Sequence, residues 1–292
     1  MPDFGIMRGF NEKLFGDKLV AGQLPTQLGL IGSTDFGFDA DAQAFFDRVT
    51  AATGTLSNTE KLAVDTLVRQ MKLDGIWSLM KAIYPMVGAS AAACSQNLKS
   101  SSFTGSFSTG WTFASTGVTP NGTSAYMDTT FNTNTNQSVN NFSLSVYIRS
   151  ASTAGQRADM GNANSPTFLP LTTLESNTTM RSQFSWDFTL GGGRANITTT
   201  DSRGMWGVSR SGATSWQSFE RNTSVSKTTS TTQTVLPNLN IYIGATNINT
   251  GAYQFSDRQI AFAHLGDKLS NTEFNNFYTA VQAFQTTLSR QV

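Results

Sequence analysis

The chain has 292 residues, with 20 Lys and Arg against 19 Asp and Glu, and only 13% of its residues are charged. This length allows one large or two small domains with a sizeable core. The balanced charge without a basic run gives no basis for a nucleic-acid partner. The single cysteine, Cys94, excludes intrachain disulfides and thiol–metal clusters.

Charge is especially sparse between residues 101 and 180, where only five charged residues occur. A surface built from Ser, Thr, Asn and Gln suits a compact all-β body that holds its place in an assembly. Simple compositional bias explains the same facts equally well.

The sequence shows no sign of export or of membrane insertion. Residues 1–10 lack the apolar segment of a signal peptide, and no stretch approaches about 18 consecutive apolar residues. We therefore predict no membrane span and a protein made in the cytoplasm. Cys94 lies among alanines, which favours a buried, unreactive thiol.

Residues 1–37 mix glycines with apolar residues and show no regular period. A segment this irregular cannot form its own core, yet it is too hydrophobic to remain in water. We predict an extended docking arm, with contacts from Phe4, Ile6, Phe10, Leu14, Phe15, Leu19, Leu24 and Leu28. Docking on another protein and packing on its own domain are both compatible with the sequence.

Residues 38–88 are predicted to form a small helical unit. Asp39 or Asp41 can cap a first helix, and Ser57 with Glu60 forms a capping box that starts a second. Residues 76–84 continue as a short helix or a strand that ends at proline. The small, Ser-rich residues 89–102 are the expected connector and domain boundary.

From residue 103 onward the chain reads as short strands between turns. Residues 141–149 alternate cleanly, with four apolar side chains on one face. Further candidate strands are 110–114, 118–128, 167–173, 180–190, 194–199, 204–209, 215–222, 224–227 and 239–245. Many short strands at near-regular spacing favour a sandwich over a parallel sheet.

The last 35 residues organise the rest of the chain. Ile260, Phe262 and His264 alternate with Ala261, Ala263 and Leu265, which predicts a strand covered on both faces. A capping box of Ser270 and Glu273 starts a helix that runs to about residue 288. Its aromatic face needs a partner surface, and the β region is the obvious one. That face consists of Phe274, Phe277, Tyr278, Val281, Phe284 and Leu288.

The motif Gly-Asp-x-Leu-Ser-x-x-Glu-Phe at 266–274, between a strand and a closing helix, resembles the end of laminin-G/concanavalin A-like jelly rolls, particularly those of bacteriophage virion proteins. Three earlier motifs match in order: Asn-Gly-Thr-Ser-Ala-Tyr, Phe-Ser-Leu-Ser-Val-Tyr-Ile and Ile-Tyr-Ile-Gly-Ala. Residues 7–28, 39–45 and 75–88 are also similar to phage structural proteins. The resemblance implies a mainly β fold with a helical N-terminal unit, in which residues 103–292 form a β-sandwich closed by the C-terminal helix.

The sequence offers little catalytic chemistry. His264 is the single histidine, and its strand setting favours a structural role over a general base. Counting excludes His- or Cys-based metal sites. Related jelly rolls sometimes bind Ca²⁺, for which Asp128, Asp159 and Asp201 are candidates, but no motif supports it. We predict no metal and no cofactor. We also predict no catalytic residue, because the paired acids of a glycosidase are not evident.

Aromatic residues in the β region offer faces on which sugar rings can stack, although burial is the default for most of them. Trp206 and Trp216 flank a Gly/Ser-rich stretch, which allows a position at a loop edge. Together with Tyr253, they are the predicted glycan-contact residues.

With the resemblance, these features predict a phage virion structural protein, anchored by its arm, that displays the jelly roll for attachment to a host-surface glycan. The alternative is a purely architectural head or tail component without a ligand, and a glycan hydrolase has the least support. The implied partners are other virion proteins, copies of the chain itself and a bacterial surface glycan. A trimer is the working assumption for self-association, because fibres are often threefold.

Overall fold

A computed structural model describes residues 37–151, 156–164, 167–170, 173–176, 179–183, 194–199, 201–210, 212, 214–228 and 235–292. Residues 38–292 form one compact unit. The expected docking arm, with its contact residues Phe4 to Leu28, lies outside the described residues.

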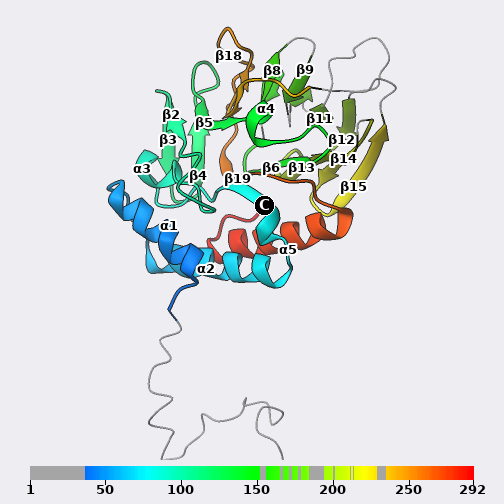
Figure 1. The fold of residues 1–292 in the computed structure, drawn as a ribbon. Helices are drawn as coiled ribbons and strands as arrows, with labels where there is room; N and C mark the ends of the chain where they lie inside the picture. Colours follow the sequence, from blue (N-terminus) through cyan, green and yellow to red (C-terminus); the bar gives the residue numbers. More distant parts are fainter. Residues whose placement is uncertain are drawn as a thin grey trace, which may run out of the picture. The chain divides into compact units, whose positions relative to one another are not determined.

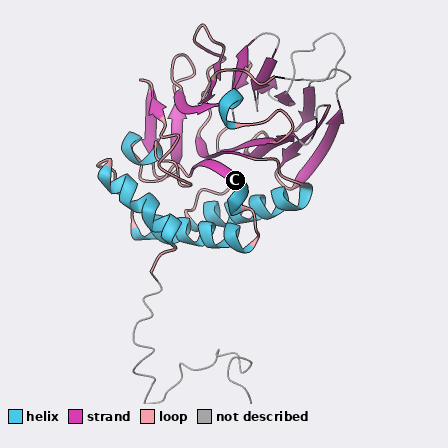
Figure 2. Cartoon of the chain, viewed as in Figure 1, coloured by secondary structure: helices cyan, strands magenta, loops and turns pink. Residues whose placement is uncertain are grey.

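The described residues form a β-sandwich with the three longest helices on one side of it (Figures 1 and 2). The helices are α1 (Ala40–Ala51), α2 (Asn58–Leu73), the 3-10 helix η3 (Trp77–Leu79), α3 (Ala91–Cys94), α4 (Thr133–Asn136) and α5 (Asn271–Thr287). The predicted architecture, a mainly β sandwich closed by a C-terminal helix, is confirmed.

The central layer is an eight-stranded antiparallel sheet. Its order is β15 (Thr223–Thr228), β14 (Ser215–Glu220), β13 (Gly204–Arg210), β6 (Phe142–Ile148), β19 (Ile260–Gly266), β4 (Gly117–Pro120) and β3 (Trp111–Ala114), with β1 (Met80–Tyr84) also paired to β19.

A seven-stranded sheet lies opposite. Its order is β18 (Ala252–Tyr253), β17 (Thr246–Asn247), β8 (Met160–Asn164), β16 (Asn240–Ile243), β5 (Met127–Asn132) and β2 (Ser106–Phe107), with β9 (Thr167–Pro170) paired to β8. A further sheet has the order β12 (Arg194–Thr198), β11 (Thr179–Gln183), β10 (Thr173–Ser176) and β7 (Arg157–Ala158).

Strand β19 is buried along its whole length, as its apolar alternation predicts. Phe262 packs in the core beneath the helices, whereas Ala263 and Leu265 pack in the core between the sheets. Ile260 also lies between the sheets, on the face opposite to the one expected. The cause is an irregularity in the pairing with β6 between Ile260 and Phe262, which shifts the alternation by one residue.

Helix α5 covers the face of the eight-stranded sheet that points away from the seven-stranded sheet. Both hydrogen bonds of the predicted capping box between Ser270 and Glu273 are present. The Phe274 ring stacks on Phe219 of β14, with centroids 3.8 Å apart and planes 9° apart. A Cβ atom at Gly207 of β13 would lie 2.4 Å from the Phe274 ring, so glycine allows this close approach.

The helical segment is not a separate domain. Phe45 of α1 and Leu67 of α2 share one core with Phe262 of β19 and Phe284 of α5. Residues 76–84 form a 3-10 helix followed by strand β1, which joins the central sheet. The expected boundary at residues 89–102 is therefore wrong, because packing over long sequence distances merges the helices with the sandwich.

The expected connector is itself held in place by a buried side chain. Asn97 is fully buried, and its Oδ1 accepts hydrogen bonds from the backbone N–H groups of Ile83 and Lys99. Its Nδ2 donates to the backbone oxygen of Ser102 at 2.9 Å. Because an unpaired buried amide is costly, these bonds fix the segment against β1.

The residues after α5 close the same core. The guanidinium of Arg290 is fully buried and donates to the backbone oxygens of Pro85, Met86 and Ala261. Burial lowers the pKa of Arg290 to about 10, so it remains charged at neutral pH. The backbone N–H of Val292 donates to the Tyr147 hydroxyl at 3.0 Å.

If α5 seals the sheet through its aromatic face, Phe274→Ala should lower the free energy of unfolding by about 3–5 kcal/mol, because it leaves a cavity above Gly207 and Phe219. Denaturant unfolding measures this, and the exposed Asn275→Ala on the same helix is the control, with an expected change within about 0.5 kcal/mol. Equal effects of the two substitutions would contradict the sealed interface.

Candidate functional site

The outer face of the seven-stranded sheet is the candidate site, and its strand register shows which residues lie on it. Partners across paired strands point to the same face. The inward row packs in the core between the sheets and consists of Phe107, Met127, Ile243 and Met160. The neighbouring row, of opposite phase, consists of Ser106, Asp128, Tyr242, Gly161, Thr246 and Tyr253.

Two tyrosines form a stacked pair on this face. Tyr126 lies two residues before Asp128 and so points to the same side. Its ring stacks on Tyr242 with centroids 4.4 Å apart and planes 16° apart. Both residues are half-buried, so part of each side chain remains in contact with solvent. We call the surface that carries Tyr126, Asp128, Tyr242 and Tyr253 the tyrosine face.

Asp128 supplies a fixed carboxylate beside the tyrosine pair. Its Oδ1 accepts a hydrogen bond from the backbone N–H of Thr130 at 2.8 Å, and its Oδ2 accepts one from Asn240 Nδ2 at 3.3 Å. Burial, and then the nearby carboxylate of Asp128, raise the pKa of the Tyr242 phenol. Tyr242 therefore keeps its hydroxyl proton at neutral and mildly basic pH. Tyr126, Tyr242 and Asp128 together combine flat apolar rings with an oriented hydrogen-bond acceptor.

Tyr253 lies farther along the same row, on the edge strand β18. It pairs with Thr246 of β17, which in turn pairs with Gly161 of β8. The residue is 54% exposed, which makes it one of the few large hydrophobic side chains of the described chain with so much accessible surface. The structure thus places one of the three predicted glycan-contact residues at the surface.

The other two predicted contact residues are buried. Trp206 of β13 and Trp216 of β14 are each 2% exposed and pack between the sheets, and Trp206 Nε1 donates to the backbone oxygen of Ser202 at 2.9 Å. The expected position at a loop edge is wrong for both, because the strands on either side of the Gly/Ser-rich stretch turn these rings into the core. Neither ring is available for stacking in this structure.

Tyr126 and Tyr242 were missed by sequence reasoning, although one signal pointed to Tyr242. Ile241 and Ile243 flank it and are both buried, so the alternation places Tyr242 on the outer face. The sequence contains no comparable sign that Tyr126 would stack on it.

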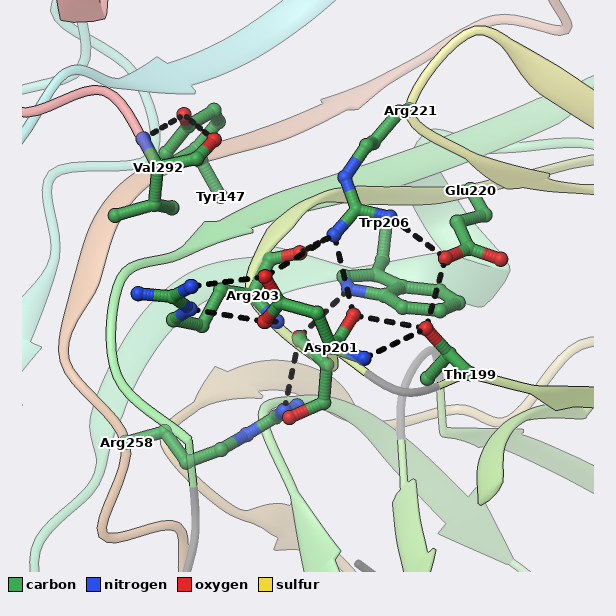
Figure 3. A network of polar contacts seen from close by, with 10 residues as sticks. Tyr147, Thr199, Asp201, Arg203, Trp206, Glu220, Arg221, Arg258 and Val292 are labelled. Carbon is green, nitrogen blue, oxygen red and sulfur yellow. Dashed lines mark hydrogen bonds and ion pairs between the residues drawn. The ribbon is translucent and has the colours of Figure 1, made fainter. Parts of the chain in front are cut away.

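A second polar cluster lies where β13 and β14 meet the segment before β13 (Figure 3). Arg203 holds Asp201 through two hydrogen bonds of 2.8 and 2.9 Å. Arg221 donates to Glu220 Oε1 at 2.7 Å and to the backbone oxygens of Asp201 and Arg203. The hydrogen bond from Arg203 lowers the pKa of Asp201, so this carboxyl is poorly suited to act as a general acid.

Beneath this cluster, Arg258 and Asp159 form a fully buried ion pair. Arg258 Nε lies 3.0 Å from Asp159 Oδ1, and Arg258 Nη1 donates to the backbone oxygen of Ser202. The pair joins the start of β8 to the segment that leads into β19. Breaking one partner of such a pair leaves an uncompensated buried charge, which gives the pair a structural role.

His264 is also fully buried. Its Nδ1 lies 3.2 Å from Ser145 Oγ, its ring meets the edge of Phe277, and Nε2 has no hydrogen-bond partner among the described residues. Burial lowers the pKa of His264 to about 3, so the ring is neutral under ordinary conditions. A catalytic triad would need an accompanying carboxylate, and within the described chain no carboxylate hydrogen-bonds to this ring.

The described residues contain no group of three or more His, Cys, Asp or Glu side chains that could hold a metal ion. Of the three calcium candidates, Asp159 and Asp201 are paired with arginines. Burial raises the pKa of Cys94 to about 12. Within the same described part, no helix is long and apolar enough to span a membrane.

Two grooves lie elsewhere, and no aromatic ring lines either of them. One of about 740 Å³ lies at the start of α5 and is lined in part by Asn141, Gln217 and Lys268. One of about 480 Å³ lies between the start of α2 and the end of α5, beside Glu60. Neither groove contains the residues of the tyrosine face.

No protein-family model and no curated protein matches the sequence. Among solved structures, the chain is similar to domain 4 of AbnA, a GH43 extracellular arabinanase from Geobacillus stearothermophilus in complex with arabinotriose, at 12% identity, with 68% of this chain and 98% of that chain covered and a TM-score of 0.48.

It is also similar to a Trypanosoma rangeli sialidase mutant with trans-sialidase activity, at 12% identity and a TM-score of 0.49 over 75% of this chain and 39% of the sialidase. The botulinum neurotoxin serotype D binding domain shows 10% identity and a TM-score of 0.48, with 70% and 52% covered. With TM-scores below 0.5, none of these similarities bears on what this chain binds.

The buried neutral histidine predicts a pH dependence of stability. Because the pKa of His264 falls from an ordinary 6.5 to about 3 on folding, the unfolded chain binds the extra proton between these values. Stability is therefore fully present above pH 6.5 and is lost as pH falls, by up to about 1.4 kcal/mol per pH unit from this group. Urea unfolding of wild type and His264→Asn between pH 7 and pH 4 gives the slope of the free energy of unfolding against pH for each protein. The difference between the two slopes removes the contribution of the other titrating groups. Parallel profiles would contradict the prediction.

Proposed function

We propose that the chain is a carbohydrate-binding β-sandwich that holds its ligand on the tyrosine face and does not cleave it. The single observation that carries this proposal is the stacked pair of Tyr126 and Tyr242, with the oriented carboxylate of Asp128 beside it. Trp206 and Trp216, which the sequence favoured, do not contribute because they are buried.

The chemistry of the pair suits a sugar. A sugar ring has an apolar C–H surface edged with hydroxyl groups. An exposed aromatic ring can cover the apolar surface, while an ionised carboxylate accepts hydrogen bonds from neighbouring hydroxyls. Hydrogen bonds to a charged acceptor are stronger than those between neutral groups, and the two bonds that already hold Asp128 limit the entropy lost on binding. Binding sites of this kind need few polar groups when those groups are fixed.

The proposal that the chain is not an enzyme follows from its carboxylates. Glycoside hydrolysis generally needs two acids flanking the bond, one of them with a raised pKa. The register places one carboxylate, Asp128, in the outward row of described residues. Asp201 has a lowered pKa and is held by Arg203. These features support binding rather than cleavage.

Alanine substitution of Tyr242 tests the proposal. We expect Tyr242→Ala to weaken binding by about tenfold or more, because it removes one ring of the pair. Affinity electrophoresis through gels that contain neutral or acidic polysaccharides measures the retardation. Tyr278→Ala, in the helical layer, is the matched control and should bind as wild type does. If no polysaccharide in the panel retards the wild type, or if both variants bind equally, the proposal is wrong.

We also propose that the chain is a component of a bacteriophage particle, on which it attaches to a host-surface glycan. This rests on the sequence motifs alone, as do the virion partners and the assembly of several copies. Immunogold labelling of purified particles should place the chain on the virion, and its absence from them would reject this location. A purely architectural component would be found there as well, but Tyr242→Ala would leave adsorption to host cells unchanged.

A further inference from the structure

We infer that the tyrosine face takes an extended, uncharged glycan chain, which lies across the strands from the Tyr126–Tyr242 pair to Tyr253. This inference rests on the proposed carbohydrate binding and adds the length and the charge of the ligand. Two features carry it: the register between the two aromatic sites and the charge of the face.

The register fixes the separation of the two aromatic sites. Tyr242 of β16 pairs with Gly161 of β8, Gly161 pairs with Thr246 of β17, and Thr246 pairs with Tyr253 of β18. Three steps between adjacent strands, each about 4.8 Å, separate the two tyrosine backbones by about 14 Å. One sugar ring that stacks on the Tyr126–Tyr242 pair cannot reach Tyr253. A chain of several rings can contact both.

The surface between the two sites carries no large side chain in this row. Gly161 and Thr246 are both buried, so other atoms of the chain already cover these two positions. A ligand that reaches both tyrosine sites therefore passes over these covering atoms and gains no contact from Gly161 or Thr246.

The charge of the face favours a neutral ligand. Asp128 is the ionisable acid of the row, and its oxygens are held by Thr130 and Asn240 rather than by a cation. Arg157 of β7 lies 3.7 Å from Asp257 and donates to the backbone oxygens of Gly122 and Phe255. An acidic glycan would thus meet the carboxylate of Asp128, which forms no ion pair with the described residues, and like charges at short range repel.

Titration calorimetry with the full chain tests the inference. The probes are neutral oligosaccharide series (malto-, cello-, xylo-, manno- and arabino-oligomers) from disaccharide to octasaccharide, with oligogalacturonates as the acidic series. At least one neutral series should bind, with the octasaccharide at least tenfold tighter than the disaccharide. Oligogalacturonates should bind more weakly than that series.

Tyr253→Ala should bind the octasaccharide only about as tightly as it binds the disaccharide. Urea unfolding of this variant should match the wild type, which is the control for folding. Asp128→Asn should reduce the difference in affinity between the neutral and the acidic oligosaccharides.

Three failures are distinguishable. If Tyr242→Ala abolishes binding but Tyr253→Ala behaves as wild type at every chain length, the extended ligand is rejected and carbohydrate binding stands. If the acidic series binds tightest, the uncharged ligand is rejected. If no oligosaccharide binds and no polysaccharide gel retards the protein, the proposed function itself fails.

Discussion

Strand β19 carries apolar side chains on both faces, and two different layers cover them. On one face, Phe277 and Phe284 of α5 pack against Phe262. On the other face, Met160 and Ile243 of the seven-stranded sheet belong to the same core as Leu265. A strand of this kind is stable only when both covers are present, since each apolar face left in water costs about 25 cal/mol per Å². The helical layer is therefore part of the sandwich core and not an appended domain.

This constraint also decides where a ligand can bind. Both faces of the central sheet pack against other layers, which leaves its described central strands without an open surface. On the outer face of the seven-stranded sheet, Tyr126 and Tyr242 are half-buried and Tyr253 is exposed. The same division explains the fate of the tryptophans: Trp206 and Trp216 belong to strands of the central sheet and are buried with it. The tyrosines belong to the opposite sheet.

Local signals predicted local structure well. The capping box of Ser270 and Glu273 and the alternation of β19 depend on neighbours within a few residues, and both are present. Long-range packing was not predictable in the same way. Nothing in residues 76–84 shows that they pair with β19, and the stacking of Tyr126 on Tyr242 depends on the pairing of strands far apart in the chain. The single-residue shift at Ile260 shows that a clean pattern can still hide an irregularity.

Amide hydrogen exchange under native conditions tests the central claim, that β19 is held between two layers, most directly. The amides of β19 and β6 should exchange most slowly, near the limit set by global unfolding, whereas those of the edge strands β3 and β15 should exchange earlier through local opening. If β19 exchanged as fast as β3 and β15, its burial by α5 and by the opposing sheet would be contradicted.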